Sequence, residues 1–291
     1  MGKRCSLPAL FAQEARAFSA VAFCVCAEPC RTNRMDLLEV PKTSFRRHPW
    51  EVARARFFRD LLGRSGVMAH ASSILDVGAG DGYLANIVAE RMPSEGRVVC
   101  FDPLYTNEDI SRFSADTAAR LTFTRLRPQQ QFDVALLLDV VEHVEDDREF
   151  LGGFVSSNVK PGGSVLVSVP AWQALFTQHD VTLKHYRRYS PQLVMRLLED
   201  ANLRVVKSGG LFHGPLLPRA LTALRESFAR IFGQTSSTPA NLGDWRGGPM
   251  LSDVAERLLF ADNFVSAKAA DFGWSLPGLS FWALCEKPTH P

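Results

Sequence analysis

The chain has 291 residues, of which 46% are hydrophobic and 22% are charged. This balance is that of an ordinary globular protein and excludes a disordered or fibrous chain. The formal net charge of +2 is too even to predict a basic binding face, so we expect no nucleic-acid partner. The length fits one large domain with an insertion as well as it fits two domains.

Residues 1–34 are predicted to form an N-terminal extension outside the fold. A basic start and a short apolar run resemble a secretory signal, but charged residues lie close to that run. The spacing of Cys24, Cys26 and Cys30 is compatible with zinc, yet no fourth ligand is nearby. We therefore expect a reduced, cytoplasmic chain whose folded domain spans residues 35–291.

From residue 35 onward, apolar runs typical of strands alternate with patterns of helical spacing. The predicted strands cover residues 72–78, 97–102, 121–126, 132–141, 164–170, 204–212 and 279–287. The predicted helices cover residues 50–62, 82–92, 146–158, 190–200, 214–233 and 249–269. Residues 160–163, with the sequence KPGG, are predicted to be a turn, and residues 213–274 a helical insertion before the last strand. This alternation predicts an α/β fold with a doubly wound, largely parallel sheet.

The stretch ILDVGAGDGYLANIVAE leads a buried strand through a glycine turn into a helix. Gly78, Gly80 and Gly82 remove side chains at the edge where such sheets bind ligands. A dinucleotide-binding turn has the pattern G-x-G-x-x-G, but its sixth position is Tyr83 here. Asp76, before the first glycine, would also repel a pyrophosphate. Both features disfavour an NAD-dependent dehydrogenase, which stays open as an alternative.

Two carboxylates flank this turn. Asp76 is suited to a ligand that carries an ammonium or sulfonium group. Asp102, at the end of the second strand, is suited to the hydroxyls of a ribose. Together they favour S-adenosylmethionine as the cofactor.

Several segments carry the pattern of one known family: LDVGAGDGYLA, VVCFDP, FDVALLLDVVEHVEDDREFL, VKPGGSVLVSVP and the last two strands. They resemble the class I S-adenosylmethionine-dependent methyltransferases of the type-11-like small-molecule group, over roughly residues 48–287. The resemblance implies a Rossmann-like, seven-stranded sheet with helices on both faces, whose antiparallel last strand is inserted beside the sixth. It also implies which residues bind the cofactor: Asp76, Gly78, Gly80, Gly82, Asp102 and Asp139.

The resemblance implies in-line transfer of a methyl group to a small-molecule, glycan or lipid-linked acceptor. Alignment of donor and acceptor is expected to supply most of the acceleration, because the sulfonium is already reactive. A methyltransferase-like fold kept as a silent binding or scaffold protein is the alternative from another class.

Polar residues follow the fourth predicted strand, where this fold binds the acceptor. Asp139 and His143 are candidate catalytic residues, with His143 as the base, and the alternative is that they only line the pocket. The segment also resembles the metal-binding segment of small-RNA 2′-O-methyltransferases and ubiquinone-pathway O-methyltransferases, in which a later histidine completes the site. His179 or His185 would take that place, and both are counted as candidate catalytic residues. Because the Glu-His pair at this place is common in members without metal, we expect no metal.

The segment HYRRY lies in a long loop after the fifth strand. Tyr186, Arg187 and Arg188 are candidate substrate-binding residues, since arginine binds phosphate or carboxylate and tyrosine stacks. The alternative is a solvated basic entry to the next helix. The segment resembles a bacterial subgroup associated with cell-envelope glycan or lipid modification.

The helical insertion at residues 213–274 is expected to cap the acceptor pocket as a lid. Its basic residues Arg219, Arg225 and Arg230 suggest a second expectation, peripheral contact with the inner membrane face. The alternative is that both helices only face the core. No obligate protein partner is evident.

Overall fold

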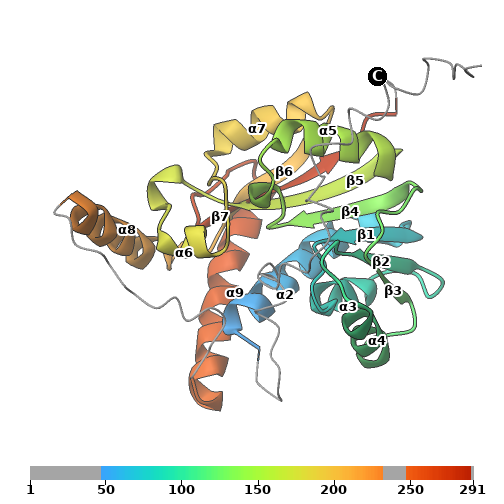
Figure 1. Ribbon diagram of the computed structural model, residues 1–291, viewed down its shortest axis with the longest axis horizontal. Helices are drawn as coiled ribbons and strands as arrows, with labels where there is room; N and C mark the ends of the chain where they lie inside the picture. Colours follow the sequence, from blue (N-terminus) through green and yellow to red (C-terminus); the bar gives the residue numbers. More distant parts are fainter. Residues whose placement is uncertain (1–46, 232–246, 290–291) are drawn as a thin grey trace, which may run out of the picture. The chain divides into compact units, whose positions relative to one another are not determined.

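The computed structural model describes residues 47–231 and 247–289. Its core is a seven-stranded sheet with the order β3-β2-β1-β4-β5-β7-β6 (Figure 1). The strands are β1 (Ser73–Val77), β2 (Arg97–Phe101), β3 (Leu121–Thr124), β4 (Phe132–Leu138), β5 (Val159–Pro170), β6 (Arg204–Leu211) and β7 (Ser280–Glu286). The first five strands pair in parallel, and β7 lies antiparallel between β5 and β6. The predicted sheet is confirmed, including the inserted last strand.

Helices cover both faces of this sheet (Figure 1). One face carries α2 (Pro49–Arg64), α3 (Tyr83–Ala89), α4 (Asn107–Asp116) and α9 (Pro249–Asp271), and the other carries α5 (Asp147–Asn158) and α7 (Pro191–Asp200). Each layer closes over its own apolar cluster. In α2, for example, Phe57, Phe58, Leu61 and Leu62 are buried at the spacing of one helix face.

Two local predictions were wrong. The expected turn at residues 160–163 lies inside β5 as a bulge: the pairing with β4 jumps from Val159 to Ser164, and Gly162 between them adopts a positive φ of 76°. Helix α4 was missed. Thr106 and Asp109 cap it reciprocally, and this capping box was a readable signal in the sequence.

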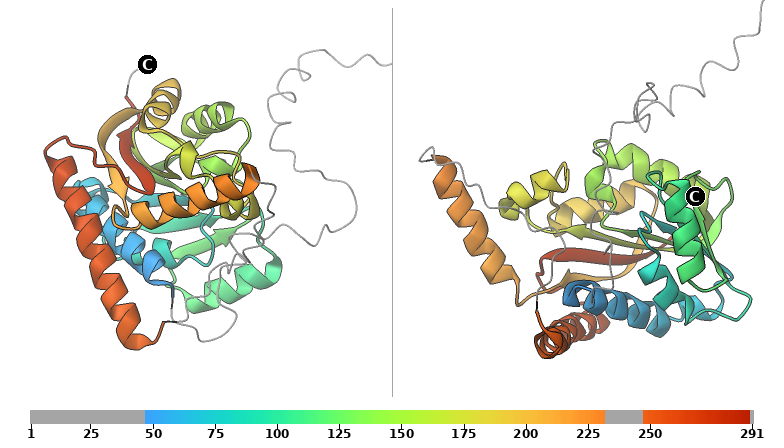
Figure 2. Two further views of the ribbon diagram at one scale, coloured as in Figure 1. Left: turned by 90° about the vertical axis from the view of Figure 1, so that its left-hand side faces the viewer. Right: turned by 60° about the horizontal axis from the view of Figure 1, so that its bottom comes forward.

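The segment between β6 and β7 contains α8 (Leu216–Ile231) and α9. Helix α9 packs along α2 and against β6, so it belongs to the helical layer on the sheet (Figure 2). Helix α8 instead contacts η3 (Gln173–Leu175), next to α6 (Gln178–Thr182). The two helices of the insertion therefore have different surroundings.

Residues 1–34, for which an N-terminal extension and a possible zinc spacing of cysteines were considered, lie outside the described residues. Over residues 47–231 and 247–289, none of the helices combines the length and the apolar character that crossing a bilayer requires.

Candidate active site

A cavity of about 500 Å³ opens at the carboxyl ends of β1, β4 and β5. This edge is where open α/β sheets bind their ligands. One end of the cavity is lined by the glycine turn after β1 and by residues of α2. The other end is lined by η2 (Val141–His143), by the loop that contains α6, and by Arg219 of α8. We refer to these as the turn end and the histidine end.

The three glycines of the turn all have positive φ, at 66°, 56° and 76° for Gly78, Gly80 and Gly82. Gly78 and Gly80 line the cavity. A Cβ built on Gly80 would meet nothing within 4 Å, so the open space of the cavity reaches its backbone. A Cβ on Gly82 would lie 2.6 Å from Cζ of Phe123. Gly82 therefore allows close packing of the turn, and it is outside the lining that the described residues form.

The two predicted carboxylates differ in their access to the cavity. Asp76 lines it and is only 3% exposed. Burial raises the pKa of Asp76 to about 7, although the positive charge of Arg54 opposes this. Asp102 is buried outside the lining formed by the described residues, and its Oδ1 accepts a hydrogen bond of 2.9 Å from the backbone N–H of Leu104. Burial also raises the pKa of Asp102.

Sequence reasoning missed Tyr105, which supports the turn from beneath. Its hydroxyl donates a hydrogen bond of 2.5 Å to the carbonyl oxygen of Gly80. Its ring packs edge-on against Phe113 and Phe123, with ring centroids 5.9 Å apart in both pairs. The turn is therefore fixed by an aromatic cluster as well as by its own backbone.

Two arginines were also missed, Arg54 inside the amphipathic pattern of α2 and Arg47 just before that helix, because neither belongs to a recognisable motif. Arg54 pairs with Asp139, which also accepts a hydrogen bond of 2.9 Å from the hydroxyl of Ser168. Asp139 lines the cavity and has a φ of 58°, a conformation often found at functional sites. Arg47 pairs with Asp81 of the glycine turn. Arg47 and Arg54 thus add cationic groups to the turn end.

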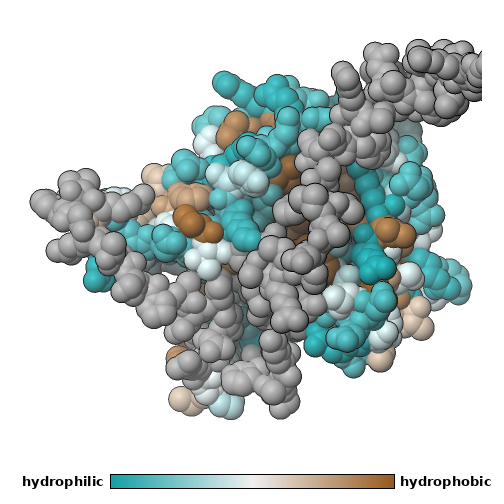
Figure 3. All heavy atoms as spheres, in the orientation of Figure 1, coloured by the Kyte–Doolittle hydropathy of each residue, from teal (hydrophilic) through white to brown (hydrophobic). Residues whose placement is uncertain are grey.

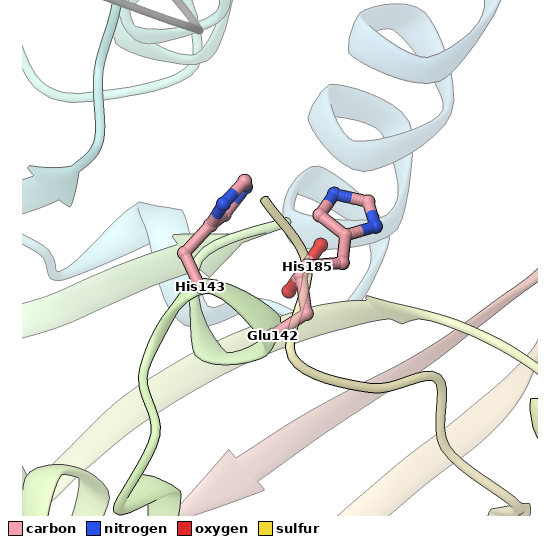
Figure 4. A group of neighbouring side chains, drawn as sticks. All are labelled: Glu142, His143 and His185. Atoms are coloured by element: carbon pink, nitrogen blue, oxygen red, sulfur yellow. The ribbon is translucent and has the colours of Figure 1, made fainter. Parts of the chain in front are cut away.

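His143 and His185 meet at the histidine end, with ring centroids 4.7 Å apart and planes inclined by 78°. His143 comes from η2 and His185 from the loop before α7 (Figure 4). Burial lowers the pKa of His143 to about 4, with a further contribution from His185. The imidazole of His143 is therefore uncharged at neutral pH and able to accept a proton.

Glu142 lies beside these two histidines and is fully buried (Figure 4). The ligand atoms of Glu142, His143 and His185 all lie within 4.8 Å of one another. A carboxylate and two imidazoles form a donor set that fits a divalent ion. His179, the alternative to His185 for this role, and the nearby Asp139 are not part of this described group.

Asp180 is fully buried and binds several residues of the histidine end. It caps α6 by accepting a hydrogen bond of 2.9 Å from the backbone N–H of Thr177. It also pairs with His185 at 3.1 Å, with Arg188 at 2.7 Å and with Arg219 at 2.7 Å. Burial alone would raise the pKa of Asp180, but these partners hold it well below the ordinary value.

The three predicted substrate-binding residues separate in the structure. Arg188 is buried and lines the cavity. Arg187 instead pairs with Asp147 at 2.8 Å, and Tyr186 is 52% exposed. Neither of these two is part of the lining formed by the described residues. His179 does line the cavity, so the structure brings His143, His179 and His185 together there.

A parallel sheet with an antiparallel strand inserted before its edge, and a glycine turn preceded by an acid at its ligand edge, define the class I methyltransferases. Residues 43–208 match the family model described as "Methyltransferase domain". This match covers more than half of the chain, and the chain belongs to that family.

The chain is similar to enzymes named ubiquinone biosynthesis O-methyltransferase. It is 26% identical to the one from Rhodopseudomonas palustris over 163 residues, which are 49% of this chain and 62% of the relative. It is 30% identical to the one from Rickettsia canadensis over 102 residues, which are 33% of this chain and 41% of the relative. The chain thus spans less than two thirds of the length of these relatives.

Among solved structures, the chain is similar to geranyl diphosphate methyltransferase in complex with SAM. The TM-score is 0.50 at 13% identity, over 81% of this chain and 85% of that chain. At this identity the likeness shows the shared fold.

Proposed function

We propose that this chain transfers a methyl group from S-adenosylmethionine to a hydroxyl of a small-molecule, glycan or lipid-linked acceptor. One observation carries the proposal: a single cavity joins the glycine turn and Asp76 to the uncharged imidazole of His143. The similarity to relatives named O-methyltransferases supports oxygen as the acceptor atom.

The turn end would hold the donor. The backbone at Gly80 lets a ligand approach closely, and the Asp76 carboxylate attracts its cationic end. S-adenosylmethionine supplies an activated methyl group on a sulfonium. Arg54 pairs with Asp139, and both line the cavity, so this half-buried ion pair fixes part of the wall against which donor and acceptor would be aligned.

His143 would take the proton from the acceptor hydroxyl. Its lowered pKa keeps the ring uncharged, so it accepts a hydrogen bond from the hydroxyl before transfer and the proton during it. His185 packs against this ring and is itself fixed through its Nδ1 by Asp180. The positioning of the base thus depends on the buried carboxylate behind it.

A divalent ion at Glu142, His143 and His185 is a second candidate for activating the hydroxyl, because the ligand atoms of these residues all lie within 4.8 Å of one another. The hydrogen bond between Asp180 and Nδ1 of His185 leaves Nε2 of that ring for a ligand, which is a common arrangement in metal sites. Such an ion would bind the acceptor hydroxyl and lower its pKa.

Helix α8 supports a lipid-linked acceptor. Leu217, Leu221, Leu224 and Phe228 recur at one-face spacing, and each is more than half exposed. The same helix carries Arg219 to the cavity. Apolar side chains also gather near α6 and α8 in an otherwise mostly polar view of the surface (Figure 3). An acceptor with its head in the cavity could therefore run its apolar chain along α8 and bring this face to a membrane surface.

Calorimetry with S-adenosylmethionine and with NADH tests the donor. We expect binding of the sulfonium compound alone, and tight NADH binding without it would contradict the proposal. Lysate metabolites and lipids incubated with the protein and an isotope-labelled methyl donor then test transfer. A labelled product identified by mass spectrometry reveals the acceptor, whereas donor binding without any labelled product would favour a silent binding protein.

Treatment with a chelator separates the two ways of activating the hydroxyl. If His143 acts as the base alone, the transfer rate stays within about twofold of the untreated rate. A loss that added Mg²⁺, Mn²⁺ or Zn²⁺ restores would assign the role to the ion instead.

A further inference from the structure

Two arginines line the cavity at the histidine end, and the one carboxylate that both of them bind lies outside the lining formed by the described residues. Arg188 and Arg219 line the cavity, while Asp180 lies behind them, outside the lining formed by the described residues. Both guanidinium groups bind this one carboxylate, each at 2.7 Å. A single buried negative charge is thus shared by two positive charges.

The hydrogen-bonding capacity of Asp180 is already used. One oxygen accepts from His185 and Arg188, and the other accepts from Arg219 and the backbone N–H of Thr177. Arg188 donates a further bond of 3.2 Å to the carbonyl oxygen of Ala171. In contrast, Nε of Arg219 is buried and has no hydrogen-bond partner among the described residues. A buried donor without a partner costs free energy, which a bound acceptor atom would recover.

The surroundings of Arg219 disfavour its positive charge. Burial and the neighbouring Arg188 lower the pKa of Arg219. Burial and the charge of Arg219 in turn lower the pKa of His179. Glu226 also faces Arg219, but it accepts a hydrogen bond of 2.9 Å from the backbone N–H of Gln178 and is not part of the cavity lining formed by the described residues. Glu142 also lines the cavity at this end, so Glu142 and Asp180 together match Arg188 and Arg219 in number of charges. The buried Nε of Arg219, and no excess of positive charge, is therefore what favours an anionic ligand here.

We propose that Arg219, with Arg188 beside it, binds an anionic group of the acceptor, a carboxylate or a phosphate. This inference rests on the proposed function, because it assigns the histidine end to the acceptor. Arg219 determines specificity and lies on α8, apart from His143, the candidate base on η2. An acceptor held in this way carries its anionic group toward α8 and its reacting hydroxyl toward His143.

Calorimetric titration of the protein loaded with S-adenosylhomocysteine tests the proposal without turnover. The probes are benzoate, phenyl phosphate and the uncharged benzamide. We expect at least one of the two anions to bind about tenfold more tightly than benzamide, the ratio that one charge-assisted hydrogen bond supplies. The preferred anion identifies the group as a carboxylate or as a phosphate.

Three variants on α8 locate the effect. Arg219→Gln should abolish the preference for the anion, and Arg219→Lys, which keeps the charge but loses the Nε donor, should retain part of it. Arg225→Gln is the matched control, because Arg225 is exposed on the same helix and its substitution removes the same charge. Thermal melting confirms that each variant is folded.

Equal affinity for anions and benzamide in the unaltered protein would overturn the inference, and so would the absence of anion binding at millimolar concentration. A preference that survives in Arg219→Gln would also overturn it. Failure of the proposed function is recognised separately, because it appears as a lack of S-adenosylhomocysteine binding. In that event the titration of the unloaded protein still reports whether Arg219 selects anions.

Discussion

The two ends of the cavity differ in the parts of the chain that line them. At the turn end, side chains of α2 lie beside a stretch of bare backbone, which Gly78 and Gly80 bring to the cavity. At the histidine end, side chains from η2, the α6 loop and α8 converge on Asp180 and on the pair of His143 and His185. The turn end is therefore sensitive to an added Cβ atom, and the histidine end to the loss of a single polar group.

The largest difference between the ends is expected from His143→Ala. Removal of a general base typically lowers the rate by about 10² to 10⁴. Because His143 lies at the histidine end, the affinity for S-adenosylmethionine should stay unchanged. Steady-state kinetics with the identified acceptor and calorimetry with the donor measure the two effects separately.

The matched control for this variant is His70→Ala, since His70 is exposed outside the cavity and should leave both quantities unchanged. Equal losses in rate from both variants, or a loss of donor affinity in His143→Ala, would contradict the division of the cavity into two ends.

Gly80→Ala tests the turn end by adding a methyl group, whereas His143→Ala removes a side chain from the histidine end. Gly80 and Gly66 both have positive φ, and a Cβ on either would meet nothing within 4 Å, but only Gly80 lines the cavity as described. Each substitution should destabilise the fold by about 1 kcal/mol through backbone strain. Only Gly80→Ala should also weaken donor binding, by about tenfold, because its methyl group enters ligand space.

Melting temperatures and calorimetry of both variants provide the comparison. If Gly66→Ala weakens donor binding as much as Gly80→Ala does, strain transmitted through the fold explains the loss, and direct contact at Gly80 does not.

The sequence singled out cavity-lining residues at both ends, such as Gly80 and His143, but it indicated none of the partners that hold them, for a physical reason. The glycine spacing, Asp76 and the buried strand are contiguous, so local pattern is enough to identify them. The histidine end depends on contacts such as that between Asp180 and Arg219, which are 39 residues apart. Likewise, Arg54 and Asp139 are separated by 85 residues. No periodicity along the chain reports such pairings.

The segment HYRRY illustrates the same limit at shorter range. Arg187 and Arg188 are adjacent and chemically identical, yet one pairs with Asp147 and the other with Asp180. Their difference arises from the direction in which the backbone presents each side chain to its surroundings. The sequence therefore indicated a cationic segment, and the tertiary structure determined which of its cations reaches the cavity.

The pH dependence of donor binding tests whether the charge of Asp76 attracts the donor. Because burial raises the pKa of this carboxyl to about 7, acid conditions keep it neutral and remove its attraction for a cationic ligand. The affinity for S-adenosylmethionine should therefore rise severalfold between about pH 6 and 8. Calorimetry across this range measures the effect, and Asp76→Asn should bind more weakly with a flatter profile. A profile of equal slope in that variant would assign the pH dependence to another group.

The stability of the free protein should show the opposite trend. The folded pKa of Asp76 lies above the ordinary value of 3.8, so the folded state holds a proton that the unfolded state releases. Its contribution to stability is complete below the ordinary pKa and is lost as the pH rises through about 7. Asp76→Asn should lose this part of the slope, which melting curves between about pH 4 and 8 would reveal.

The smallest expected effect concerns the outer surface of α8, beyond the histidine end. The double variant Leu221→Gln and Leu224→Gln removes two exposed apolar side chains from the face that we assign to the lipid-linked part of the acceptor. Sedimentation with phospholipid vesicles should show about a threefold loss of bound protein, since each partly exposed leucine contributes only a fraction of its full burial energy. Leu126→Gln is the control, because Leu126 is 74% exposed near β3. An equal loss with this control, or no vesicle binding by the unaltered protein, would confine the role of α8 to Arg219 and the cavity.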